Sequence, residues 1–118
     1  MKDFMLVFRN TVQNEENFAK QSPEQMQSEF ASWKTWMDNL AKDGKLVGGD
    51  PLFPNGKVLK GTSKKLVDGP FVEGKDIIGG YMHIKANDYE DAIALSKECP
   101  ALNSNEGSVE IREIMPAG

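Results

Sequence analysis

The length of 118 residues predicts a single domain over residues 1–118, with a buried core that a partner subunit would help to complete. A hydrophobic content of 39% and a charged content of 27% argue against disorder, and no apolar run approaches the ~20 residues of a membrane span. The net charge of −4 argues against a nucleic-acid-binding protein, which needs a basic patch. The one cysteine, Cys99, excludes an internal disulfide, fits a cytoplasmic location and is expected to be a small buried side chain.

The first third of the chain predicts a strand, a loop and a long helix. Residues 3–9 are apolar on both faces, which indicates a strand covered on both sides, and the polar residues 10–21 are expected to form a loop. Residues 22–25, Ser-Pro-Glu-Gln, show the pattern of a capped helix start with a capping box. The helix is expected to end at Gly44 and to bury one apolar stripe: Met26, Phe30, Trp33, Met37 and Leu40, with Trp36 on its flank.

The middle of the chain predicts short strands joined by turns. Residues 45–50 suit a second strand, whose Gly48-Gly49 pair marks a close approach by another backbone or a ligand. Residues 54–56, Pro-Asn-Gly, suit a hairpin turn that would pair the apolar residues on either side. A further short strand is expected at residues 64–67.

The charged side chains between Pro51 and Val67 are all positive. Two interpretations are open: the lysines keep a solvated hairpin soluble, or they offer a positive rim to an anionic small molecule. The four residues are Lys57, Lys60, Lys64 and Lys65.

A sharp turn at Asp68-Gly69-Pro70 precedes a strand over residues 77–86. Asp68 can hydrogen-bond to backbone two residues on, Gly69 tolerates positive φ, and Pro70 fixes its own φ. The alternation of the strand places on its core face Ile78, Gly80, Met82, Ile84 and Ala86. The opposite face, which has the mixed character of a site wall or a subunit interface, carries Ile77, Gly79, Tyr81, His83 and Lys85.

The last third predicts a second helix and a closing strand. Asp88 suits the N-cap of a helix of about ten residues that ends before Pro100. Residues 108–114 suit a strand with Val109 and Ile111 facing inward. The element order predicts an α+β domain with two helices on one face of an antiparallel sheet. The other face is expected to meet a second copy of the chain, which makes a homodimer.

The stretch DGPFVEGKDIIGGY at residues 68–81, a short helix with a Cys-Pro stop, and GSVEIRE at residues 107–113 resemble the DGPF subgroup of the YCII-related family. The resemblance extends over nearly the whole chain. It implies a ferredoxin-like domain that pairs sheet to sheet as a dimeric α+β barrel, a fold shared by muconolactone isomerases, small cofactor-free monooxygenases and ligand-sensing domains. Reactions differ across that superfamily, and members of the subgroup are also known beside sigma-factor-like proteins.

The motif of the subgroup falls on Asp68, Gly69, Pro70, Phe71, Glu73, Lys75, Gly79, Gly80 and Tyr81, and in the last strand on Ser108, Val109, Glu110 and Arg112. The YCII branch proper resembles an enzyme in which a histidine near the first helix works with an aspartate. The only histidine here is His83, on a later strand, so that dyad is not carried over.

Two residues are candidates for catalysis. Asp68 is a candidate general base if the dimer raises its pKa, and the alternative is that it only caps its turn. His83 is the natural proton carrier near neutral pH, and the alternative is a structural role.

Seven further residues are candidates for ligand binding. Arg9 and Arg112 suit either a clamp on a carboxylate or a bridge to Glu110 of the partner subunit. Lys75 can pair with a ligand or with Glu73. The set is Tyr81, Arg112, Arg9, Phe71, Lys75, Gly79 and Gly80.

Two functions therefore stay open, and the sequence does not decide whether the protein is an enzyme. The first is a cytoplasmic homodimer that binds a small polar or anionic organic molecule in a cleft between the copies, with acid–base chemistry and no cofactor. The second is a non-catalytic sensor or interaction module of the same fold. One histidine and one cysteine at these spacings make no metal cluster, so no metal is expected.

Overall fold

The computed structural model describes residues 1–69 and 76–117. The motif positions within residues 70–75 therefore lie outside the described residues. The elements in chain order are β1 (Lys2–Thr11), α1 (Val12–Ala19), α2 (Pro23–Lys42), β2 (Leu46–Pro51), β3 (Gly56–Lys60), β4 (Lys65–Gly69), β5 (Asp76–Ala86), α3 (Tyr89–Ser96), the 3₁₀ helix η1 (Pro100–Asn103) and β6 (Ser108–Glu113).

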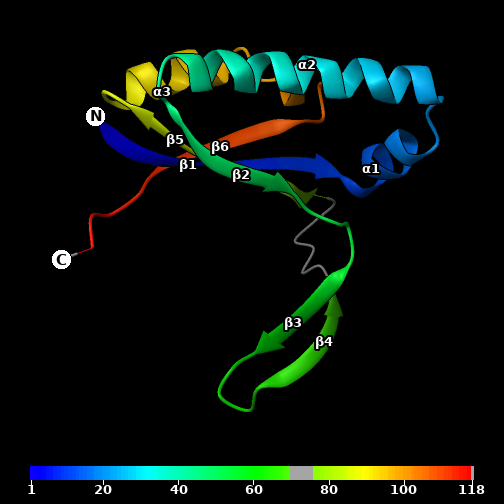
Figure 1. Cartoon of the computed structure of the whole chain (residues 1–118). Coiled ribbons are helices and arrows are strands. Elements are labelled where there is room, and N and C mark those ends of the chain that lie inside the picture. Colours follow the sequence, from blue (N-terminus) through cyan, green and yellow to red (C-terminus); the bar gives the residue numbers. More distant parts are fainter. Residues whose placement is uncertain (70–75, 118) are drawn as a thin grey trace.

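The main sheet is antiparallel and has the strand order β2-β5-β1-β6. Together with α2 and α3 this is the ferredoxin-like arrangement, which confirms the predicted α+β fold. Figure 1 shows α2 and α3 lying across the same face of the sheet. None of the helices in the described part of the chain combines the length and the apolar character that a membrane span requires.

The core lies between this face and the two helices. The strands β1 and β5 contribute alternate residues, because every second side chain of a strand points to the same face. The fully or nearly fully buried side chains are Phe4, Leu6, Met82, Ile84 and Ala86 from the sheet and Trp36, Leu40, Ala92 and Cys99 from the helical layer. Val109 and Ile111 of β6 pack against this core as predicted.

The start of α2 is the one that the sequence predicts. Ser22 Oγ accepts a hydrogen bond from the backbone of Gln25, and the Gln25 side chain accepts one from the backbone of Ser22. Gly44, with φ of +71°, follows its last turn. The predicted stripe is only partly correct, since Phe30 is 61% exposed while the flanking Trp36 is buried. The first turns of α2 face α1 rather than the sheet, and Phe30 contacts Phe18 there.

The expected loop over residues 10–21 is wrong, because it contains α1. Thr11 caps this helix: its Oγ1 accepts a hydrogen bond from the backbone of Asn14. In Figure 1 α1 lies beyond the end of β1, below the first turns of α2. The only long apolar side chain inside it is Phe18, so the segment lacks the repeating stripe that reveals a helix in sequence.

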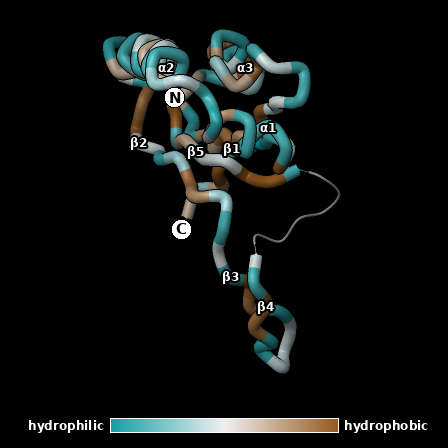
Figure 2. Tube along the Cα trace, turned by 90° about the vertical axis from the view of Figure 1, so that its right-hand side faces the viewer, coloured by the Kyte–Doolittle hydropathy of each residue, from teal (hydrophilic) through white to brown (hydrophobic). Residues whose placement is uncertain are grey.

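The predicted hairpin turn at residues 54–56 is also wrong. Leu52 and Phe53 do not pair with Val58 and Leu59; instead β3 pairs with β4, with Leu59 opposite Leu66. The turn lies at residues 61–64, where Gly61 and Lys64 take positive φ. We call β3, β4 and their turn, residues 56–69, the hairpin arm. Both views show it standing away from the sheet and helices (Figures 1 and 2).

The predicted faces of β5 are correct except at its start. The register along β1 shifts where Phe8 pairs with Gly80 and Arg9 with Ile78, so Gly79 is an extra residue on β5. Adjacent glycines inside a strand are typical of such a bulge. The bulge exchanges the faces before it, and therefore Ile77 is buried and Ile78 is exposed.

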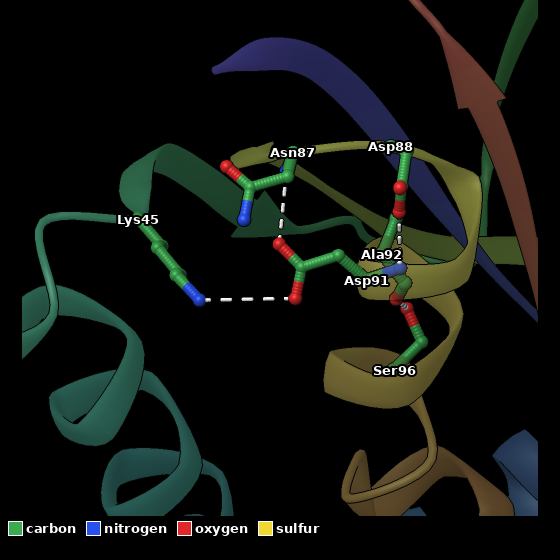
Figure 3. A network of polar contacts seen from close by, with 6 residues as sticks. All are labelled: Lys45, Asn87, Asp88, Asp91, Ala92 and Ser96. Atoms are coloured by element: carbon green, nitrogen blue, oxygen red, sulfur yellow. Dashed lines mark hydrogen bonds and ion pairs between the residues drawn. The ribbon is translucent and has the colours of Figure 1, made fainter.

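The start of α3 is held by two aspartates, as Figure 3 shows. Asp88 caps the helix as predicted: its Oδ1 accepts a hydrogen bond from the backbone of Asp91 at 2.8 Å. The Asp91 carboxylate accepts one from the backbone of Asn87 at 2.8 Å and lies 3.8 Å from Lys45 Nζ. Because Lys45 directly precedes β2, this contact ties the start of α3 to the far edge of the sheet.

Candidate functional site

The sheet face turned away from α2 and α3 carries several of the predicted site residues. We call it the open face, and no helix in the described part of the chain covers it. Its centre is formed by Met5 and Val7 of β1, which lie opposite His83 and Tyr81 of β5. The remaining polar members are Asp3, Asp50, Lys85, Glu110 and Arg112.

The open face brings His83 together with a carboxylate. His83 Nε2 lies 2.8 Å from Asp3 Oδ1, and Lys85 Nζ lies 3.7 Å from the same oxygen. The hydrogen bond with His83 and the charge of Lys85 hold the pKa of Asp3 below its ordinary value. A histidine oriented by a carboxylate is an arrangement that general acid–base catalysis uses. The catalytic role of His83 nevertheless stays a prediction.

Tyr81 also has an acidic partner on the open face. Its hydroxyl donates a hydrogen bond to Asp50 Oδ2 at 3.1 Å, from the neighbouring strand β2. This hydrogen bond, and then the negative charge of Asp50, raise the pKa of Tyr81. Tyr81 is thereby kept protonated and serves as a donor.

The two predicted arginines share one carboxylate. Arg9 Nε lies 3.3 Å from Glu110 Oε1, and Arg112 Nη1 lies 3.8 Å from Glu110 Oε2. Both arginines thus reach Glu110 of their own chain. Their use as a clamp for a ligand carboxylate stays a prediction, because Glu110 would first have to release them.

A second set of predicted residues, Arg9, Gly79 and Gly80, lies at a cleft beneath the middle of α2. The cleft has a volume of about 610 Å³ and is closed at one end by α1. We call it the aromatic cleft, because its apolar lining is Phe8, Phe18, Phe30, Trp33, Met37 and Met82. The rings of Phe8 and Trp33 meet edge to face at 5.1 Å between centroids.

The close approaches at the double glycine involve the chain itself. A side chain at Gly80 would meet the Asp50 carbonyl oxygen at 3.1 Å, and one at Gly79 would meet Glu15 Oε1 at 3.0 Å. Gly79 therefore leaves room for the Glu15 carboxylate at the aromatic cleft.

Among the polar residues of this cleft, the sequence gives no direct sign of Gln21, Glu15 and Glu29. Gln21 Oε1 is buried and has no hydrogen-bond donor among the described residues. Glu15 and Glu29 are half-buried, and neither forms an ion pair within the described part of the chain. The only sequence signal for the position of Glu15 is the Thr11 N-cap. A helix that begins after Thr11 turns Glu15 toward the strands.

A second hollow of about 680 Å³ lies between α2 and α3. It is more open than the aromatic cleft, and its lining is richer in polar side chains, including Ser28, Ser32 and Thr35. A ligand there would remain largely in water, so we regard the aromatic cleft as the better site for a small molecule.

Asp68 belongs neither to the open face nor to the lining of the aromatic cleft. It lies on β4 in the hairpin arm, its side chain is 85% exposed, and it forms an ion pair with Lys57 on the opposite strand. Its catalytic role stays a prediction. The candidates Phe71 and Lys75 lie outside the described residues.

Cys99 is 2% exposed, which agrees with the expected small buried side chain. Burial raises the pKa of its thiol to about 12, so it is not a nucleophile at neutral pH. Within residues 1–69 and 76–117, no three histidine, cysteine or acidic side chains gather in a way that could hold a metal ion.

Comparison with protein-family models identifies the chain. The model of the YCII-related domain matches residues 4–117, from the first core residue of β1 to beyond β6. The chain belongs to the YCII-related family. No curated protein matches this YCII-related chain.

Proposed function

We propose that this YCII-related protein binds a small organic molecule in the aromatic cleft. The observation that carries the proposal is Gln21 Oε1, a buried acceptor at this cleft without a donor among the described residues. A buried acceptor left without a donor costs about 1–3 kcal/mol, so a ligand N–H or O–H group there would recover this free energy. The volume of about 610 Å³ suits a small molecule.

The charges of the cleft favour a donor group and disfavour an anion. The cations Lys34 and Arg9 at the cleft are already engaged: Lys34 Nζ donates to Asp38 at 2.7 Å, and Arg9 pairs with Glu110 outside the cleft. Glu15 and Glu29 remain as acceptors. The ligand is therefore expected to have an aromatic or apolar body and an ammonium, amide or hydroxyl group. Of the sequence-based alternatives, this supports the polar molecule over the anionic one.

Three probes of one shape test this proposal. 2-Phenylethylamine, 2-phenylethanol and phenylacetate share a ring and a two-carbon chain but end in a cation, a neutral donor and an anion. We expect titrations followed by the fluorescence of Trp33 and Trp36 to give millimolar binding, with the amine tightest and phenylacetate weakest. Trp33→Leu should weaken all three, because it removes part of the shared apolar wall.

Glu15→Gln is expected to weaken amine binding about fivefold and to leave alcohol binding unchanged. Glu16→Gln is the matched control, because Glu16 is exposed and does not line the cleft. Tightest binding of phenylacetate would contradict the proposed ligand class. Absence of binding by all three probes would contradict a small-molecule site in this cleft.

A second candidate function is acid–base chemistry on the open face. It is favoured by the 2.8 Å contact between His83 and Asp3, since the carboxylate orients the ring. Replacement of a carbon-bound hydrogen of acetoacetate by solvent deuterium, followed by proton NMR, would measure such chemistry.

His83→Asn should reduce the exchange rate on the order of 100-fold, the typical contribution of a positioned acid–base group. Trp33→Leu serves as the control, because it alters the aromatic cleft on the other side of the sheet and should leave the rate unchanged. An exchange rate no faster than that in buffer alone would exclude this candidate function for acetoacetate. An exchange rate in His83→Asn equal to that of the wild type would exclude it as well.

Within the family we assign the chain to the DGPF subgroup. The assignment is supported by the motif from Asp68 to Tyr81 and does not depend on either function. A member of the subgroup that binds a ligand but catalyses no reaction would act as a sensor. This is the second of the two functions that the sequence leaves open.

A further inference from the structure

The helix α1 forms one wall of the aromatic cleft but is weakly anchored to the rest of the chain. In Figure 1 it lies below α2 and beyond the end of β1. None of its described side chains is fully buried, whereas α3, which also has eight residues, buries Ala92 and Ser96. A helix this short does not persist on its own in water. Because elements with few buried apolar contacts open at low free energy, we expect α1 to detach while the sheet stays folded.

The two ends of α1 are held by different contacts. In its first turn, Asn14 Nδ2 donates a hydrogen bond to Ser104 Oγ at 3.0 Å, which joins this end to the loop before β6. In its last turn, the ring of Phe18 meets the ring of Phe30 edge to face at 6.0 Å between centroids, and Phe30 is 61% exposed. An aromatic contact so open to water holds less firmly than the hydrogen bond, so the last turn is the end that can lift.

The end that can lift carries groups that a ligand in the aromatic cleft would contact. Phe18 belongs to the apolar lining of the cleft. Gln21, whose Oε1 is buried without a donor among the described residues, lies in the short link between α1 and α2. Lifting this end would therefore open the cleft and bring the Gln21 acceptor into water in the same movement.

Closure of an empty cleft leaves the Gln21 acceptor unsatisfied. A buried acceptor that has lost its hydrogen bond to water is destabilising, which favours the open position of α1. A ligand that donates to Gln21 Oε1 removes this cost only in the closed position, and only there does it also pack on Phe18. A ligand shifts a conformational equilibrium by the difference in its affinity for the two states, so such a ligand favours closure.

We propose that α1 is a lid on the aromatic cleft, that Gln21 keeps this lid partly open while the cleft is empty, and that a ligand with a donor group closes it. The ligand-driven closure rests on the proposed function. The effect of Gln21 on the empty protein does not rest on it, because it depends only on the unsatisfied acceptor.

The first test measures hydrogen exchange of the backbone amides in the ligand-free full chain. Corrected for intrinsic rates, exchange in α1 should be at least about tenfold faster than in α3. Gln21→Met, which replaces the amide by an apolar thioether of similar length, should slow exchange in α1 about fivefold and leave α3 unchanged. Gln27→Met is the matched control, because Gln27 is exposed and does not line the cleft. Exchange in α1 as slow as in α3, or not slowed by Gln21→Met, would overturn the proposal.

The second test adds 2-phenylethylamine at a concentration that saturates the change in tryptophan fluorescence. Exchange in α1 should slow at least about tenfold, and exchange in α3, which does not line the cleft, should stay unchanged. In Gln21→Met the probe should slow α1 less than in the wild type, because it finds no amide acceptor there. A saturable fluorescence change without slower exchange in α1 would overturn the lid and leave the binding site in place. Absence of a fluorescence change would contradict the proposed ligand site instead, and the first test would still decide whether Gln21 controls α1.

Discussion

At the scale of single residues, the ionisation of Asp3 is altered by a partner that only folding brings near. Its partner His83 is 80 positions away in the chain, and the antiparallel pairing of β1 with β5 brings them together. The interaction favours the carboxylate, so the pKa in the folded protein lies below the ordinary 3.8. The resulting stabilisation is fully present above that ordinary value and is lost as the pH falls through the lower folded value.

We therefore expect Asp3→Asn to lower the melting temperature near neutral pH by a small amount, on the order of 2 °C. The difference from wild type should shrink as the pH is lowered from about 5 to about 2, because the wild-type carboxylate becomes protonated too. Thermal melts at five or six pH values measure this trend.

Asp76→Asn removes the same charge at an exposed residue with no ion pair among the described residues, and it should show no such trend. A difference for Asp3→Asn that stays constant or grows at low pH would show that the interaction with His83 does not stabilise the fold.

At the scale of elements, β2 and β5 illustrate how two adjacent glycines differ in role. A side chain at Gly49 would lie 2.5 Å from the Tyr81 carbonyl oxygen and 2.8 Å from Met82 Cα. A side chain at Gly48 would meet nothing within 4 Å. Only Gly49 is therefore required for the close contact between these strands.

Gly49→Ala is expected to destabilise the protein by about 1–3 kcal/mol, because the backbones of two strands must move apart. Gly48→Ala is the matched control and should change the free energy of unfolding by less than about 0.5 kcal/mol. Urea denaturation measures both. Similar losses in the two variants would mean that strand propensity, and not the contact with β5, determines the effect.

The elements that the sequence predicts well are those with a complete local signal. The helix α2 has a cap, a proline at its start and a glycine after its end, and most of β1 and β5 alternates between buried and more exposed residues. The helix α1 has only the Thr11 cap, so its polar residues resembled a loop. The sequence predicts the hairpin turn at residues 54–56, because Pro-Asn-Gly is a strong turn signal. The actual turn at residues 61–64 depends on the cross-strand pairing of β3 with β4.

At the scale of the whole molecule, the sequence predicts only those parts of the candidate site that lie on a single strand. Alternation along β5 placed Tyr81 and His83 on one face correctly, but their partners Asp50 and Asp3 come from other strands. The aromatic cleft combines α1, α2 and the ends of three strands. No pattern within a single segment of sequence contains that arrangement, which is why Gln21 was missed.

The position of the hairpin arm in the chain has a consequence for how such proteins diversify. The arm leaves the sheet after Pro51, which pairs with Gly80 of the adjacent strand, so the chain departs and returns at neighbouring points. An insertion or deletion between these points leaves the strand order and the core unchanged. Evolution can therefore lengthen, trim or replace the arm independently of the aromatic cleft, and one sheet-and-helix scaffold can carry arms of different length and surface.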